Sequence, residues 1–180
     1  MSATAQLKSL PPTVIAVLSA NPGLIEPFVC AYPPSAPPEL PAQMQEAFLR
    51  NTSILENLRA MREWLEEEAG DAAELLISES SGPHLDLDKA WEALELALDR
   101  IPSSLALKSC VYGGREIGPD LGYGPARLLD PEEVSALALA LDRVDPAQVE
   151  AGFLRELFEQ LRVYYRQAAE RGLGMLQSLA

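Results

Sequence analysis

The chain has 180 residues and carries 27 acidic side chains against 14 Lys and Arg, so its formal net charge is −13 at pH 7. A field of this sign repels phosphate, which argues against nucleic acids and anionic membrane surfaces as partners. The length suits one domain that buries enough apolar surface to fold without a metal or a disulfide. We therefore expect a single domain spanning 1–180.

The first part of the chain predicts a strand followed by short helices. A weak alternation over 3–8 suggests an edge strand, and Ser9, ahead of a Pro-Pro pair, is typical of a helix N-cap. Asn21-Pro22 repeats this start signal for a second short helix. Residues 33–38 read PPSAPP, and we interpret them as a stiff proline-rich connector inside the domain.

The longest helical pattern extends over 39–68 and ends before Gly70. Asn51-Thr52-Ser53 interrupts the spacing, so one long helix and two helices with a kink are both open. The densest acidic run, 66–68, lies near the end of this pattern. It is either a solvated helix end or an acidic patch for a basic partner.

Residues 84–88 alternate polar and apolar side chains, which predicts a short extended segment. Asp88 is in place to cap the helix that begins near Trp91. On an extended segment His84, Asp86 and Asp88 share one face and could converge on a divalent cation. Because Asp88 already has a capping role, we predict no metal site and no cofactor.

The remaining segments predict a glycine-rich loop, helices and short strands. Residues 118–125 read GPDLGYGP and suggest an ordered loop or turn, and 127–129 suggest a short strand. The sequence Asp-Pro-Glu-Glu at 130–133 is a complete helix start. Residues 153–172 form a strong amphipathic pattern, and 175–179 are candidates for a returning strand. Helical patterns dominate, so we predict an α+β fold: a predominantly helical single domain with a small sheet of short strands.

No constellation of catalytic residues stands out. A Ser or Cys nucleophile needs a neighbouring base, and the chain has one histidine. Its glycines lack the spacing of phosphate-binding loops. We predict no catalytic residues, and we lean against an enzyme while leaving the possibility open.

A candidate binding surface follows from the extended segment and the glycine-rich loop, because Arg and Tyr beside glycines are typical anchors of contact surfaces. Its predicted residues are Asp86, Asp88, Trp91, Asp120, Tyr123 and Arg127. Alternatively, the glycines serve the turn alone. In either case we predict that the Arg127 guanidinium binds a carboxylate of Asp120, Asp86 or Asp88 and ties the loop to 84–91.

Three motifs occur together in the second half of the chain: HLDLDKAWEALELAL at 84–98, GGREIGPDLGYGPARLLDPEEVSALALAL at 113–141, and FLRELFEQLRVYYRQAAERG at 153–172. They resemble the YfbM-like family of bacterial proteins, a domain of unknown function. The resemblance implies a compact α+β domain. It implies no accepted activity, cofactor or catalytic residue.

We expect a cytoplasmic location, because the two cysteines lack disulfide or metal spacing and the apolar run 14–18 is too short for a membrane span. The main functional hypothesis is a non-enzymatic interaction domain whose acidic surface binds a basic protein, as immunity-type proteins do. The alternative is a small-ligand-binding protein or enzyme with a cleft between 84–91 and 118–127. A third hypothesis is an oligomer subunit that exposes an aromatic face at Tyr164-Tyr165. The oligomeric state itself is left open.

Overall fold

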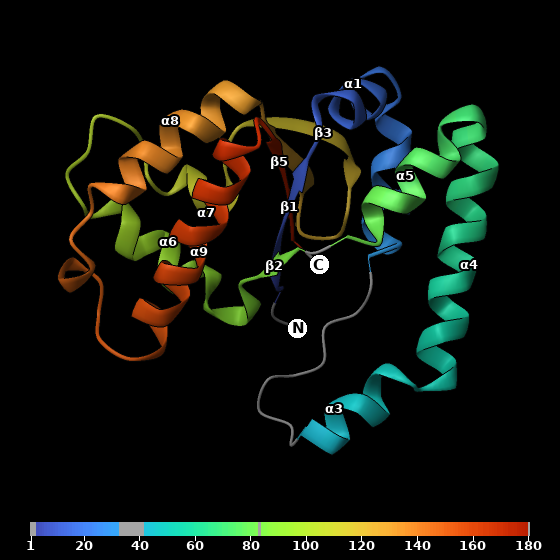
Figure 1. Ribbon diagram of the computed structural model, residues 1–180, viewed down its shortest axis with the longest axis horizontal. Helices are drawn as coiled ribbons and strands as arrows, with labels where there is room; N and C mark the ends of the chain where they lie inside the picture. The colour runs from blue at the N-terminus through green and yellow to red at the C-terminus, as the bar shows by residue number, and fades with distance from the viewer. Residues whose placement is uncertain (1–2, 33–41, 83, 180) are drawn as a thin grey trace.

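The computed structural model describes residues 3–32, 42–82 and 84–179. Five strands form one antiparallel sheet in the order β2-β1-β5-β4-β3 (Figure 1). The strands are β1 (Ala5–Leu10), β2 (Leu85–Asp86), β3 (Arg115–Asp120), β4 (Pro125–Leu129) and β5 (Gly174–Leu179). Helices make up most of the rest, so the predicted α+β class, mainly helical with a small sheet, is confirmed. The predicted connector 33–38 lies outside the described residues.

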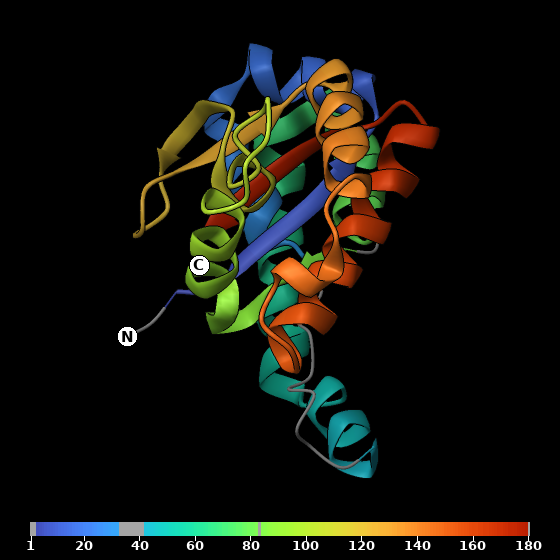
Figure 2. The ribbon, with the colours of Figure 1, turned by 90° about the vertical axis from the view of Figure 1, so that its left-hand side faces the viewer.

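Helices cover both faces of the sheet (Figures 1 and 2). One face carries α6 (Trp91–Asp99), α7 (Ser109–Tyr112), α8 (Pro131–Asp142) and α9 (Phe153–Glu170). The other face carries α1 (Pro12–Ala20), α2 (Ile25–Cys30), α4 (Thr52–Ala69) and α5 (Ala73–Ser80). Short 3-10 helices lie at η1 (Pro22–Leu24), η2 (Gly70–Ala72), η3 (Asp88–Ala90) and η4 (Pro146–Gln148).

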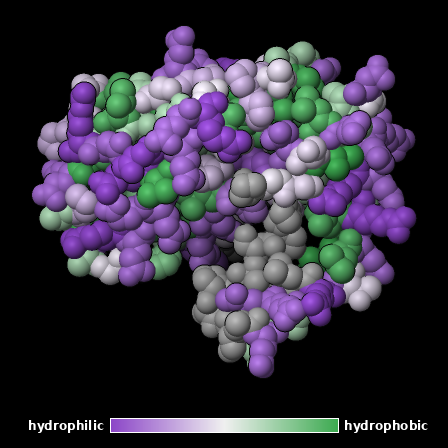
Figure 3. Space-filling view, in the orientation of Figure 1, coloured by the Kyte–Doolittle hydropathy of each residue, from purple (hydrophilic) through white to green (hydrophobic). Residues whose placement is uncertain are grey.

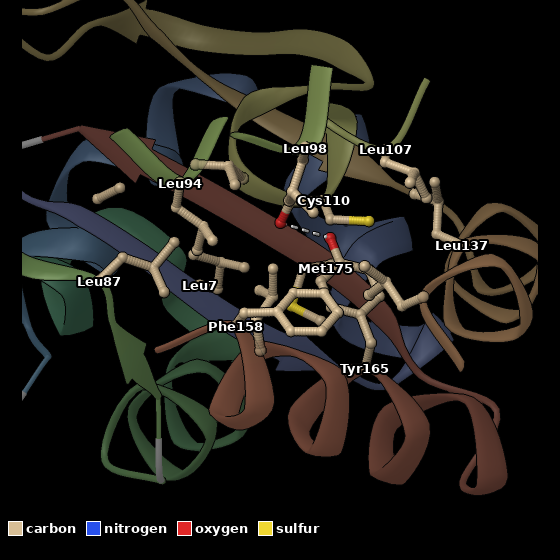
Figure 4. Packing of buried hydrophobic residues seen from close by; sticks show 14 of the residues in the cluster. Leu7, Leu87, Leu94, Leu98, Leu107, Cys110, Leu137, Phe158, Tyr165 and Met175 are labelled. Atoms are coloured by element: carbon tan, nitrogen blue, oxygen red, sulfur yellow. Dashed lines mark hydrogen bonds between the residues drawn. The ribbon is translucent and has the colours of Figure 1, made fainter. Parts of the chain in front are cut away.

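Each face of the sheet has its own hydrophobic core. The first core packs Leu7 and Met175 against Phe158 and Tyr165 of α9 (Figure 4). The second core is built from the other side of the same strands and the helices α1, α2, α4 and α5, and it includes Leu10, Phe28, Leu65 and Leu176. Successive side chains of a strand point to opposite faces, so Met175 and its neighbour Leu176 enter different cores. All six residues of β5 are buried for this reason.

The strand predicted at 3–8 exists as β1, but it begins and ends two residues later and is not an edge strand. It lies between β2 and β5, and Ser9 pairs with Met175 as part of the ladder. The predicted N-cap role of Ser9 is therefore wrong. Helix α1 begins at Pro12, and Pro11 occupies the capping position without a side-chain bond.

The long helical pattern forms two helices, α3 (Ala42–Leu49) and α4. The Asn51 side chain accepts a hydrogen bond from the Ser53 N–H at 3.0 Å and caps α4. This side-chain bond satisfies a backbone donor that the interrupted helix would leave open. Figure 2 shows α3 at the far end of α4, away from the sheet.

The glycine-rich stretch is a β-hairpin rather than a loop alone. Strands β3 and β4 pair across it, and Asp120 Oδ1 accepts from the N–H groups of Gly122 (2.7 Å) and Gly124 (2.9 Å). Both glycines have a positive φ (104° and 105°), which a side chain would disfavour. The predicted strand over 127–129 is confirmed within β4, and the returning strand at the end of the chain is β5.

In the described part of the chain, no single helix is long and apolar enough to cross a membrane. Helix α1 and the segment Pro22–Cys30 together have the length and apolar composition of a membrane span, but they are bent by 110° relative to each other. The buried side chains of this pair belong to the second core, which they share with the sheet.

Candidate functional site

Asp86 and Asp88, the first two predicted surface residues, stabilise the corner between β2 and α6. Asp86 Oδ1 accepts from the Asp88 N–H at 2.8 Å. Asp88 itself has a positive φ of 49° and begins the 3-10 helix η3. The predicted capping role of Asp88 is thus wrong: Asp86 provides the side-chain acceptor, because the chain turns before the helix begins.

Trp91 and Arg127 meet on the ring of Tyr112, a residue that the sequence analysis did not select. The Trp91 and Tyr112 ring centroids are 6.5 Å apart, and the Arg127 guanidinium lies 4.7 Å from the Tyr112 centroid. The Tyr112 hydroxyl donates to the Pro125 carbonyl at 2.6 Å. Tyr112 therefore connects α6 to β4. Its ring packs against the Trp91 ring and the Arg127 guanidinium.

The carboxylate that binds Arg127 is Glu116, not Asp120, Asp86 or Asp88. Arg127 Nη2 lies 2.8 Å from Glu116 Oε1. These two residues are register partners on the antiparallel strands β3 and β4, so their side chains stand side by side. Asp120 is occupied by the turn that it closes. The predicted bridge from the loop to 84–91 is wrong for this reason.

Tyr123 lies at the tip of the hairpin, where it is 44% exposed. Asp120 and Tyr123 thus lie at the turn, Trp91 and Arg127 at Tyr112, and Asp86 and Asp88 at the β2 corner. The six predicted residues occupy three places in the fold. Sequence spacing alone could not show this, because the strand pairing decides which of them meet.

A groove of about 500 Å³ lies where the β1–β2 edge meets α9. It combines apolar and polar side chains, and its lining residues are Ser9, His84, Leu85, Glu159, Gln160, Val163, Tyr164, Gln167, Ala168 and Arg171. The segment 84–91 of the predicted cleft therefore contributes His84 and Leu85. The opposite wall comes from α9, and no residue of 118–127 lines this groove.

Tyr164 joins the two walls of the groove. Its hydroxyl accepts from the Ser9 N–H at 2.9 Å and lies 3.3 Å from Ser9 Oγ. Burial raises the pKa of Tyr164, so the phenol stays protonated at neutral pH. Its neighbour Tyr165 is fully buried and bonded to the Cys110 carbonyl (Figure 4). Of the two rings predicted to form an aromatic face, Tyr165 is thus directed into the fold and Tyr164 lines the groove.

His84 is held in the groove by a stacked aromatic ring. Its ring lies 5.5 Å from that of Tyr32, with 29° between the planes, and Tyr32 packs edge-on against Phe28. Burial lowers the pKa of His84, and the nearby charge of Lys8 acts in the same direction. The imidazole is therefore neutral near pH 7 and offers one hydrogen-bond donor and one acceptor.

Lys8 lies behind this stack and is 1% exposed. Its ammonium group donates to the carbonyls of Ser80 (3.3 Å) and Gly82 and lies 5.3 Å from the Tyr32 ring centroid. Burial lowers its pKa to about 8, and the charge of Glu79 opposes that shift. Lys8 supports the groove from inside rather than lining it.

Sequence reasoning considered His84 only as a metal ligand and Tyr164 only as part of an aromatic face, and it missed Lys8 and Tyr32. A lysine in a strand suggests a solvent-facing position, and Lys8 shares its side of β1 with Gln6 and Leu10, so the sequence of the strand gives no signal that Lys8 is buried. Both thiols are free: Cys110 is buried, which raises its pKa, and Cys30 is exposed. In the described ranges, no three His, Cys, Asp or Glu side chains gather as metal ligands.

Comparison with known proteins gives one match. A family model described as a domain of unknown function (DUF1877) covers residues 48–177. No curated protein and no solved structure matches significantly. The groove lies partly outside the matched range, since Ser9 belongs to β1, while His84 and the α9 wall lie within it.

Proposed function

We propose that this chain, which belongs to the DUF1877 family of unknown function, binds a small organic ligand in the groove between α9 and the β1–β2 edge. The observation that carries the proposal is the combination of a mainly apolar wall with polar groups on either side. Grooves of this size with a few placed polar groups are typical of small-molecule sites. His84 and Tyr164, both shifted in pKa by burial, mark the same place.

The geometry favours binding over catalysis. The Tyr164 hydroxyl donates to Ser9 Oγ, and its raised pKa keeps the phenol protonated, so it cannot accept the Ser9 proton as a general base near neutral pH. Neutral His84 supplies hydrogen bonds. The role of the groove is therefore to hold a ligand by contact area and a few hydrogen bonds.

The test is a fragment screen read by NMR, because His84 is the single histidine of the chain and reports on this groove. We expect binding fragments to shift the His84 ring signals. Val163→Trp, which fills the groove, abolishes the shifts. Leu139→Trp is the matched control, since Leu139 is also an exposed apolar residue on a helix but does not line the groove. Equal binding to both variants contradicts the proposal.

The finer placement of the chain is also a proposal. The YfbM-like grouping, with a bacterial and cytoplasmic setting, is supported by the motifs at 84–98 and 113–141, which fall inside the matched range 48–177. Detection of the protein in the soluble cytoplasmic fraction of a bacterial source checks this placement. Recovery from the membrane or medium contradicts it.

A second candidate function is docking of a basic protein, of the kind an immunity-type protein performs. It is favoured by an acidic face on α4, η2 and α5, made of the exposed carboxylates Glu56, Glu63, Glu66, Glu67, Glu68, Asp71 and Glu74. Leu55 and Leu75 add exposed apolar side chains (49% and 38%). Figure 3 shows hydrophilic side chains, with hydrophobic ones among them, on the side of the molecule that includes these helices. Such a surface steers a basic partner toward it and makes association sensitive to salt.

Charge reversal tests this docking. We expect Glu66→Lys, Glu67→Lys and Glu68→Lys together to abolish capture of a salt-sensitive basic partner. The control combines Glu150→Lys, Glu156→Lys and Glu170→Lys, which changes the net charge equally at exposed sites elsewhere. Capture that is lost equally in both variants reports net charge and contradicts the acidic face as the docking site.

A further inference from the structure

The cations of α9 differ in their partners. Arg162 pairs with Glu159 (2.6 Å), and Arg166 pairs with Asp142 (2.5 Å). Arg155 donates to the Val149 carbonyl. Arg171, by contrast, is exposed at the end of the helix, and no ion pair or side-chain hydrogen bond joins its guanidinium to another described residue. It lines the groove.

This guanidinium faces little local negative charge in the groove. Glu159 is the carboxylate among the lining residues, and its charge is matched by Arg162. His84 is neutral near pH 7, and Tyr164 is a protonated phenol. Arg171 follows Glu170 and lies at the C-terminal end of α9, where a helix favours a cation, but no described carboxylate forms an ion pair with it. A planar guanidinium pairs best with a carboxylate or phosphate.

The rest of the groove is suited to a hydrocarbon body. Val163 is 43% exposed, and the half-buried Leu85 also lines the groove, whereas Ala168 is 2% exposed and forms its floor. Covering such side chains is favourable in proportion to the apolar area removed from water. A phosphate-rich ligand would not cover them, whereas an organic acid with an apolar part would.

We infer that the groove selects an amphipathic carboxylate, with its carboxyl group on Arg171 and its hydrocarbon part on Leu85 and Val163. This inference rests on the proposed ligand-binding function and adds the class of ligand. Gln160 and Gln167, on the same face of α9, offer amide groups to further polar atoms of the ligand.

The probe is 3-phenylpropanoate, compared with its neutral amide 3-phenylpropanamide at one pH and ionic strength. Binding is followed on the His84 ring signals, and the Trp91 indole N–H, bonded to the Ala3 carbonyl, serves as an internal reference away from the groove. We expect the acid to bind at least tenfold more tightly than the amide. Arg171→Gln weakens the acid to the level of the amide and leaves the amide unchanged.

Arg143→Gln is the matched control, because Arg143 occupies the same capping position at the end of α8 as Arg171 does at the end of α9. It leaves both affinities unchanged. Arg171→Lys, which keeps the charge, retains part of the preference for the acid. Thermal melting confirms that each variant is folded.

The outcomes separate the two proposals. Equal binding of acid and amide, or an acid affinity that Arg171→Gln does not alter, overturns the carboxylate inference while the ligand-binding function stands. Absence of any saturable His84 shift with both probes overturns the carboxylate inference, and the fragment screen decides separately whether the ligand-binding function stands. Loss of acid binding in Arg143→Gln as well as in Arg171→Gln shows a general charge effect and also overturns the inference.

Discussion

Lys8 combines a full charge with complete burial, and its surroundings explain how the fold tolerates it. Two backbone carbonyls accept from the ammonium group, and the Tyr32 ring faces it. A buried charge without such contacts would be strongly destabilising. These contacts do not fully replace water around the ammonium group, and burial therefore lowers the pKa of Lys8 to about 8.

This shift predicts how stability depends on pH. The ordinary pKa of lysine is 10.5, so between about pH 8 and 10.5 the unfolded chain binds more protons at Lys8 than the folded chain does. Stability therefore rises with pH across that window, by about 3 kcal/mol when the shift is fully expressed. Chemical denaturation of the parent and of Lys8→Met at pH 7 and pH 9.5 measures the change.

Lys8→Met keeps the length of the side chain but does not titrate, so its gain in stability over this pH interval should be smaller than that of the parent. The comparison uses the difference between two pH values, because Met also leaves the carbonyls of Ser80 and Gly82 without their donor. The same gain in both proteins would show that Lys8 keeps an ordinary pKa.

At the scale of elements, the same capping box begins two helices of different length, the long α8 and the short η4. Asp130 accepts from the N–H groups of Glu132 and Glu133, and the Glu133 side chain accepts from the Asp130 N–H in return. Asp145 forms the same reciprocal arrangement with Gln148 on the three-residue helix η4. The helix that follows Asp130, α8, has twelve residues and four of them buried.

We expect Asp130→Ala to lower the free energy of unfolding by about 1 kcal/mol, the usual loss for an N-cap. Asp145→Ala should cost less, because η4 has no buried residues and little of the fold depends on its start. Urea denaturation measures both variants. An equal loss for the two would mean that the cap acts locally, whatever the helix carries.

These elements also show how much of the fold could be predicted from the sequence. The start at Asp130 depends on four neighbouring residues, so the sequence predicts it correctly. The position of β1 depends on pairing with β5, at the other end of the chain, and so its edge assignment was wrong. The partner of Arg127 depends on the register of β3 with β4, which places Glu116 opposite it. In the groove, His84 was a candidate, whereas α9 joins it through tertiary packing alone.

At the scale of the whole molecule, one sheet separates two cores and belongs to both. Met175 and Leu176 are adjacent in β5, yet one is buried with α9 and the other with α2 and α4. Losing the sheet would expose both cores at once. The groove lies at the edge of this sheet, so any ligand that binds only the folded chain there would also stabilise the fold by mass action.

The shared sheet predicts a single cooperative unfolding transition, and the two tryptophans can report on its two sides. Trp91 packs against the first core, while Trp64 lies in α4 next to Leu65, which is fully buried in the second. Trp64→Phe leaves Trp91 as the fluorophore, and Trp91→Phe leaves Trp64. Because neither core can lose the sheet alone, each variant should give a fluorescence curve and a circular dichroism curve that coincide.

A substitution that shifts the midpoint of unfolding should then shift the fluorescence and the circular dichroism of that variant together. Fluorescence of Trp64 that changes at a lower urea concentration than the circular dichroism of the same variant would show that α4 detaches while the sheet remains folded, and the second core would then be a separate unit of stability.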